Sequence, residues 1–116
     1  MLQGTWKTAL LDISVDDDLT SEVDLDRAWE TLLIVAPTRT VSSQITIEVS
    51  EKTGGTFQDV YITDPADGGD NKVISAAGTA AFSWVVPLGG FQFIKIKLSA
   101  SQTGADQTYR VCGIRS

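Results

Sequence analysis

A length of 116 residues suits one domain with its own hydrophobic core. The net charge of −6 argues against nucleic-acid binding as the main function, and no apolar run approaches the roughly 18 residues that a membrane helix needs. The chain contains no histidine, the commonest general base, and shows no phosphate-binding glycine loop and no His/Cys cluster. We therefore expect a protein that is not an enzyme, needs no cofactor and binds neither nucleic acid nor membrane.

The first half of the chain predicts β-strands, because apolar and polar residues alternate. Alternation is clear in residues 9–15 (ALLDISV) and 43–50 (SQITIEVS). Residues 29–36 (WETLLIVA) are apolar without a break from Leu32 to Val35, which is typical of a central strand covered on both faces. Residues 21–33 also allow a helical stripe, but their β-branched neighbours favour a strand.

The second half continues the same pattern through residues 57–63 (FQDVYIT), 81–87 (AFSWVVP), 91–99 (FQFIKIKLS) and 108–116 (TYRVCGIRS). Turn signals separate these segments about every ten residues, as in sandwiches and jelly rolls. We predict an all-β fold: an antiparallel β-sandwich of jelly-roll type with about eight strands, forming a single domain over residues 1–116. The predicted core comprises Leu11, Ile13, Leu33, Val35, Ile45, Ile47, Val49, Val60, Ile62, Trp84, Ile94, Ile96, Leu98 and Val111.

Two aromatic residues depart from the pattern of their strand. Phe91 and Phe93 share the parity of Lys95 and Lys97, and not that of the apolar residues that follow. Either a β-bulge shifts the phase near Phe93, or two aromatic rings stand on the outer face. Because clustered exposed aromatics often mark partner surfaces, Phe91 and Phe93 are the predicted protein–protein contact.

The long loop that follows residue 63 is rich in Asp and Gly. Asp64, Asp67 and Asp70 are candidate calcium ligands, but their spacing does not match an EF-hand, and Asp and Gly also dominate ordinary turns. The run Asp16–Asp18 offers further carboxylates, although adjacent side chains on a strand point in opposite directions. We therefore expect a solvated connection and no metal requirement.

The single cysteine, Cys112, excludes an intrachain disulfide and fits synthesis in a reducing cytosol. Without a histidine to activate it, the thiol is expected to be a small buried apolar group. No signal peptide is visible at the N-terminus.

Charge is distributed unevenly along the chain. Residues 1–70 hold 14 acidic and 4 basic residues, whereas residues 71–116 hold 5 basic residues and 1 acidic residue. This distribution could give an acidic face opposite a basic one, or it could average out if strands of both halves interleave. The N-terminal GTWKTALLD and C-terminal TYRVCGIRS segments carry little of the charge or proline that protects exposed edge strands, so both are predicted edges open to neighbouring subunits.

Two stretches resemble galactose-binding-like jelly rolls: residues 45–60 (ITIEVSEKTGGTFQDV) and residues 91–114, an aromatic–apolar–basic strand followed by a closing strand. The resemblance implies a carbohydrate-binding module as the alternative function. Because the sugar-binding members carry their ligands on variable loops, no binding residue can be transferred.

The whole chain also resembles small β-sandwich proteins of tailed bacteriophage virions, such as head decoration proteins and capsid or tail accessories. The resemblance rests on size, acidic Ala/Thr/Ser/Gly-rich composition, and the stretches EVSEKTGGTFQDVYITDPADG and YRVCGIRS. It implies a non-enzymatic structural protein that is made in the host cytoplasm and located in the virion. Its implied partners are further copies of itself, for example in a trimer, and a major capsid or tail protein.

Overall fold

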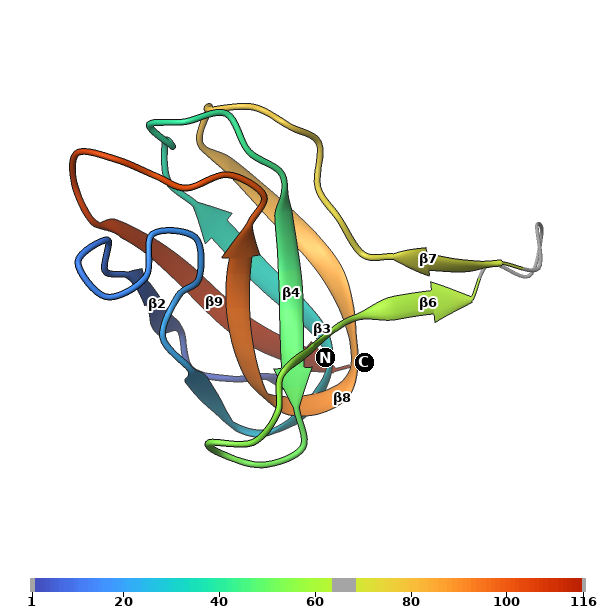
Figure 1. Cartoon of the computed structure of the whole chain (residues 1–116). Coiled ribbons are helices and arrows are strands. Elements are labelled where there is room, and N and C mark those ends of the chain that lie inside the picture. Colours follow the sequence, from blue (N-terminus) through green and yellow to red (C-terminus); the bar gives the residue numbers. More distant parts are fainter. Residues whose placement is uncertain (1, 64–68, 116) are drawn as a thin grey trace.

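Every regular element of the described chain is a β-strand. The computed structural model describes residues 2–63 and 69–115. The segment with a helical alternative is a strand from Val23 onward, and the predicted all-β antiparallel sandwich is confirmed (Figure 1). The strands are β1 (Leu2–Gln3), β2 (Lys7–Leu11), β3 (Val23–Ala36), β4 (Ile45–Ser50), β5 (Gln58–Asp59), β6 (Tyr61–Thr63), β7 (Asp70–Lys72), β8 (Phe82–Leu98) and β9 (Gln107–Arg115).

Most strands belong to one antiparallel sheet that curls back on itself to form the two layers (Figure 1). The strand order is β1-β9-β3-β8-β4-β5, and β2 also pairs with β9. The long strands β3 and β8 take part in both layers. Residues 31–36 of β3 lie between β9 and residues 82–87 of β8, whereas residues 93–98 of β8 pair with β4. Strands β6 and β7 form a separate two-stranded arm that projects from this body.

The long strands turn the corner between the layers at local irregularities. In β3 the register shifts between Asp24 and Thr31, and Asp26 adopts a left-handed conformation with φ of 74°. In β8 the turn coincides with Gly89 and Gly90, whose φ values are 72° and 94°. Such backbone conformations favour glycine and bend a strand, so these residues let one strand serve two layers.

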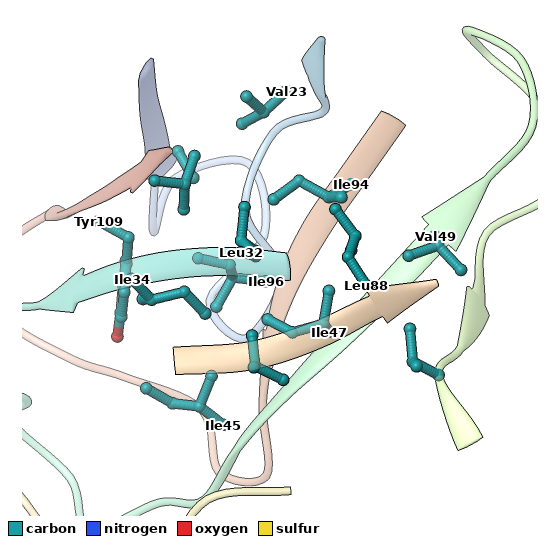
Figure 2. Close-up of a cluster of buried hydrophobic side chains, with 14 of the residues drawn as sticks. Val23, Leu32, Ile34, Ile45, Ile47, Val49, Leu88, Ile94, Ile96 and Tyr109 are labelled. Carbon is teal, nitrogen blue, oxygen red and sulfur yellow. The ribbon is translucent and has the colours of Figure 1, made fainter. Parts of the chain in front are cut away.

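The core lies between the two layers and is lined by aliphatic side chains from both (Figure 2). Trp29 belongs to this core, and its indole Nε1 donates a hydrogen bond to the Leu25 carbonyl at 2.9 Å. Of the predicted core, Ile13, Leu33 and Trp84 are half-buried. The confirmed buried residues are Leu11, Ile45, Ile47, Val49, Val60, Ile94, Ile96, Leu98 and Val111.

Two predicted core residues are wrong, because Val35 and Ile62 are exposed. In β3 the alternate residues Leu32 and Ile34 face the core, so Val35 must point to the other side of the sheet. The predicted cover on both faces of this strand is therefore also wrong: β3 is central in its sheet but buried on one face. Ile62 lies in the projecting arm, outside the two packed layers.

Of the two segments predicted to be edge strands, the N-terminal one is an edge and the C-terminal one is not. The N-terminal strands β1 and β2 pair only with β9 and form an edge. The C-terminal strand β9 lies between them and β3, so it is an interior strand. Cys112 on β9 is buried, as expected, and its Sγ lies 3.3 Å from the Gly4 carbonyl oxygen.

Strands of the two halves of the chain interleave. Lys72 forms an ion pair with Asp59 at 3.2 Å, and Lys97 lies 3.9 Å from Glu48. Each pair joins a base of the second half to an acid of the first. Because both lysines are exposed, these pairs contribute little to stability. Their importance here is that bases of the second half offset acids of the first half where the strands meet, so the uneven charge along the sequence averages out locally.

The loop after β4 is tied to the start of β3 through Glu22. The Thr53 hydroxyl and the Gly54 amide donate hydrogen bonds to the two carboxylate oxygens, at 2.5 and 2.8 Å. These bonds, first that of Thr53, lower the pKa of Glu22 from its ordinary value of 4.5. A depressed folded-state pKa contributes stability above the unfolded pKa, and this contribution is lost as the pH falls through the folded value.

We therefore expect Glu22→Gln to lower the Tm at pH 7 and the difference from wild type to narrow below about pH 4.5. Thermal unfolding followed by circular dichroism at pH 7, 4.5 and 3 measures this. A difference in Tm that stays constant across the series would contradict the role of the Glu22 carboxylate.

Candidate protein interaction surface

The structure describes only some of the acidic candidates for a metal site. Asp64 and Asp67 lie outside the described residues, as does the side chain of Asp70, so the expected absence of calcium stays a prediction. The carboxylates of Asp16, Asp17 and Asp18 approach within 4.8 Å of one another. They sit in a turn, so the expectation that they point apart is wrong. The pKa of Asp18 is raised, chiefly by its hydrogen bond with Asp16 and by burial.

The two phenylalanines predicted to form a contact are both half-buried. Phe91 follows the left-handed Gly89 and Gly90, lies opposite Trp29 and packs against the core. Phe93 lies between Asp24 of β3 and Ser50 of β4. The contact formed by this pair stays a prediction, and the most exposed apolar side chains lie elsewhere.

Strand β8 has one edge without a partner over its first half. Residues 82–87 pair with β3 on one side, and β4 begins to pair on the other side only at Phe93. Within residues 2–63 and 69–115, no strand occupies that second side of residues 82–92. An unpaired edge presents a row of backbone N–H and C=O groups, which is a template for pairing with another chain.

Two cavities lie along this unpaired edge. One of about 770 Å³ separates residues 87–91 of β8 from residues 58–62. The other, of about 530 Å³, separates Phe82 and Trp84 from residues 74–80. We call the seam the whole gap between residues 82–91 of β8 and the segments 58–62 and 74–80. At the seam, the edge of β8 and the segments across the gap do not pair with each other.

Exposed apolar side chains surround the seam. Val85 on the free strand is 64% exposed, and Tyr61 and Ile62 at the base of the arm are 58% and 45% exposed. Ile74, which follows the arm, is also exposed and lines the smaller cavity. An isolated two-stranded hairpin is marginally stable in water, so the arm gains from any surface that covers it. An apolar rim beside an open strand edge is typical of a surface that binds another protein chain.

Arg39 closes the smaller cavity at the end of the seam. Its side chain is buried, and it donates hydrogen bonds to the carbonyl oxygens of Ser43 and Ala80, at 2.9 and 3.1 Å. The guanidinium carbon lies 5.0 Å from the centre of the Phe82 ring, within cation–π range. Sequence reasoning missed this residue, because a single arginine in the loop APTRT has no pattern that separates it from a solvated base.

Tyrosine and arginine side chains lie close together near the smaller cavity. Tyr109, the other buried titratable group near Arg39, has its pKa raised to about 12 by burial, and its hydroxyl donates to Gln107 Oε1 at 2.8 Å. It is therefore a neutral structural hydrogen-bond donor at physiological pH. The described residues also include no helix that could span a membrane.

Comparisons with known proteins give a fold and no family. No family model matches the chain, and no curated protein matches its sequence. Among solved structures, the chain is similar to the SPBc2 prophage-derived protein YomS, with a TM-score of 0.57 and 13% sequence identity. The similarity covers 99% of this chain and 96% of YomS. The chain therefore shares, over its full length, the fold of a small prophage-derived protein.

Proposed function

We propose that this protein is a non-enzymatic structural component of a phage virion. It decorates or reinforces the capsid, or serves as a tail accessory, through symmetric contacts between proteins. The observation that carries the proposal is the seam: an unpaired edge of β8, two adjoining cavities and an apolar rim of Tyr61, Ile62 and Val85. The fold shared with YomS, a protein of prophage origin, supports the phage context.

Open strand edges are a liability for a protein that acts alone. Such proteins usually protect them with charged side chains, proline or a covering segment. On the free part of β8, only Pro87 gives such protection, and no charged residue occurs from Phe82 to Phe91. An edge left open in this way is expected where a partner chain covers it in the assembled state.

The alternative function, a carbohydrate-binding module, requires an aromatic platform that is open to solvent. Trp29 is buried in the core, and Trp6 lies beneath the Arg110 guanidinium at 5.2 Å. Trp84 is half-buried, with its ring 6.4 Å from that of Phe82. The three tryptophans thus favour packing over stacking on a sugar and support the structural role. Tyr61, which is 58% exposed beside the larger cavity, is the aromatic ring on which the alternative function would depend.

The test is sedimentation velocity and light scattering of the purified protein, alone and with its capsid or tail partner. We expect association, and we expect Val85→Asp to weaken it by placing a charge at the open edge. Thr108→Asp, on an exposed position of β9 away from the seam, is the matched control and should associate like wild type. A wild-type protein that stays monomeric in both settings would overturn the proposal.

A further inference from the structure

Arg39 is a buried cation that lacks a counter-charge. Only 4% of the residue is exposed, and its Nε has no hydrogen-bond acceptor. Among residues 2–63 and 69–115, the Asp70 side chain apart, no carboxylate forms an ion pair with it. A guanidinium stays charged at any physiological pH, and burying a charge without a partner is costly. The two carbonyl oxygens and the Phe82 ring offset only part of that cost.

The cavity beside Arg39 suits a ligand with one acidic and one apolar group. It has a volume of about 530 Å³, and its walls include Ile74, Ala77 and Trp84. The Arg39 Nη2 lies 4.0 Å from the position where a Cβ on Gly78 would stand, so small residues keep that side of the guanidinium uncrowded. A carboxylate bound there would supply the missing counter-charge, and an adjoining aliphatic side chain would fill the apolar part.

A segment with these two features is present in the same chain. Val15 is 82% exposed, the most exposed of the large apolar side chains described, and Asp16 and Asp17 follow it directly. The turn is preformed, because the amides of Val15 and Asp16 both donate to the Asp12 carbonyl at 2.9 Å. In Figure 1 this loop, which follows β2, lies on the other side of the domain from the β6–β7 arm. Within its own molecule the loop is held by backbone bonds, since its Asp17 carbonyl accepts from the Gln102 amide at 2.9 Å and its Asp18 carbonyl from the Leu98 amide at 2.8 Å.

We infer that the acidic loop of residues 12–18 docks into the Arg39 cavity of a second copy of this chain. Val15 enters the apolar part of the cavity, and a carboxylate of Asp16 or Asp17 pairs with the guanidinium. The occupant is identified by charge complementarity, since the loop is acidic and Arg39 has no acidic partner among the described side chains. Because the two surfaces differ, the contact is heterologous, so it closes into a ring or extends as a filament. The inference rests on the proposed structural role and specifies how copies of the chain meet.

Disulfide trapping tests the contact directly. One copy carries Val15→Cys and a second, larger tagged copy carries Ala77→Cys, both at exposed positions. On mild oxidation we expect a covalent heterodimer from this mixture. Val15→Cys mixed with Thr108→Cys is the matched control and should give little product. The native Cys112 is buried and should not react. Equal trapping in both mixtures, or none in either, would overturn the inference.

Charge reversal provides a second measurement without cysteines. Asp17→Lys and Glu30→Lys change the net charge equally, and both residues are exposed. We expect Asp17→Lys to weaken self-association about tenfold or more, and Glu30→Lys to leave it near wild type. If wild type associates but the two variants behave alike, the docking inference fails and the proposed function stands. If wild type associates with neither itself nor a virion partner, the proposed function fails as well.

Discussion

Truncation of Ile47 to alanine is expected to lower the free energy of unfolding by about 2–5 kcal/mol. Ile47 is fully buried on β4, opposite Ile96 of β8, in the cluster shown in Figure 2. The loss combines the transfer free energy of the deleted methyl and methylene groups with the cost of the cavity they leave. Equilibrium denaturation in urea, followed by far-UV circular dichroism, measures it.

Ile62→Ala is the matched control, because it deletes the same atoms from an exposed side chain. We expect it to change the free energy of unfolding by less than about 0.5 kcal/mol. Similar losses in the two variants would show that the arm is packed in solution, contrary to its exposed position here.

Gly113→Ala should be almost as damaging, with an expected loss of about 3 kcal/mol, the upper end of the usual cost of overpacking. A Cβ at Gly113 would overlap the buried Trp29 ring, and a Cβ at Gly4 would stand 2.7 Å from the same ring. The indole thus fits between two glycines. Because its Nε1 is bonded to the Leu25 carbonyl, the ring cannot move away without losing that bond.

A double-mutant cycle isolates this contact. The new methyl group would overlap Cγ, Cδ1 and Cδ2 of Trp29, which phenylalanine also has, so the background must lack the ring altogether. In a Trp29→Ala background, Gly113→Ala should cost much less than in wild type. Chemical denaturation of the four proteins gives the coupling free energy. An equal cost in both backgrounds would mean that the methyl group meets some other obstacle.

The alternation of apolar and polar residues predicted most of the fold. It failed where the residues on both faces of a strand are apolar. In SQITIEVS the polar residues mark the outer face, so Ile45 and Ile47 were placed correctly. In LLIV nothing distinguishes the two faces, and the layer that covers Leu32 and Ile34 is distant in sequence. Local pattern cannot supply that choice, because it depends on which face meets the other layer.

The candidate interaction surface was less predictable, since an open edge is a property of topology. The segment FSWVVP predicts a strand, but it does not predict that one edge of this strand lacks a neighbouring strand. That feature depends on the strand order β3-β8-β4 and on the bend of β8 at Gly89. The parity break at Phe91 and Phe93 did mark an irregular place in β8. The structure shows that this place is next to the turn between the layers at Gly89 and Gly90, while the exposed apolar residues lie on the seam beside it.

Quantitative mass spectrometry of purified phage particles tests the structural role most directly. The particles would be isolated from a host carrying the gene with its natural neighbours, and peptides of this chain would be counted against those of the major capsid protein. We expect each particle to contain a fixed copy number of this chain, equal to a whole multiple of the symmetry of the assembly that it joins. This copy number should be retained through repeated density-gradient purification. Particles that lack it, with the protein recovered only from the unassembled fraction of the lysate, would contradict a role in the virion.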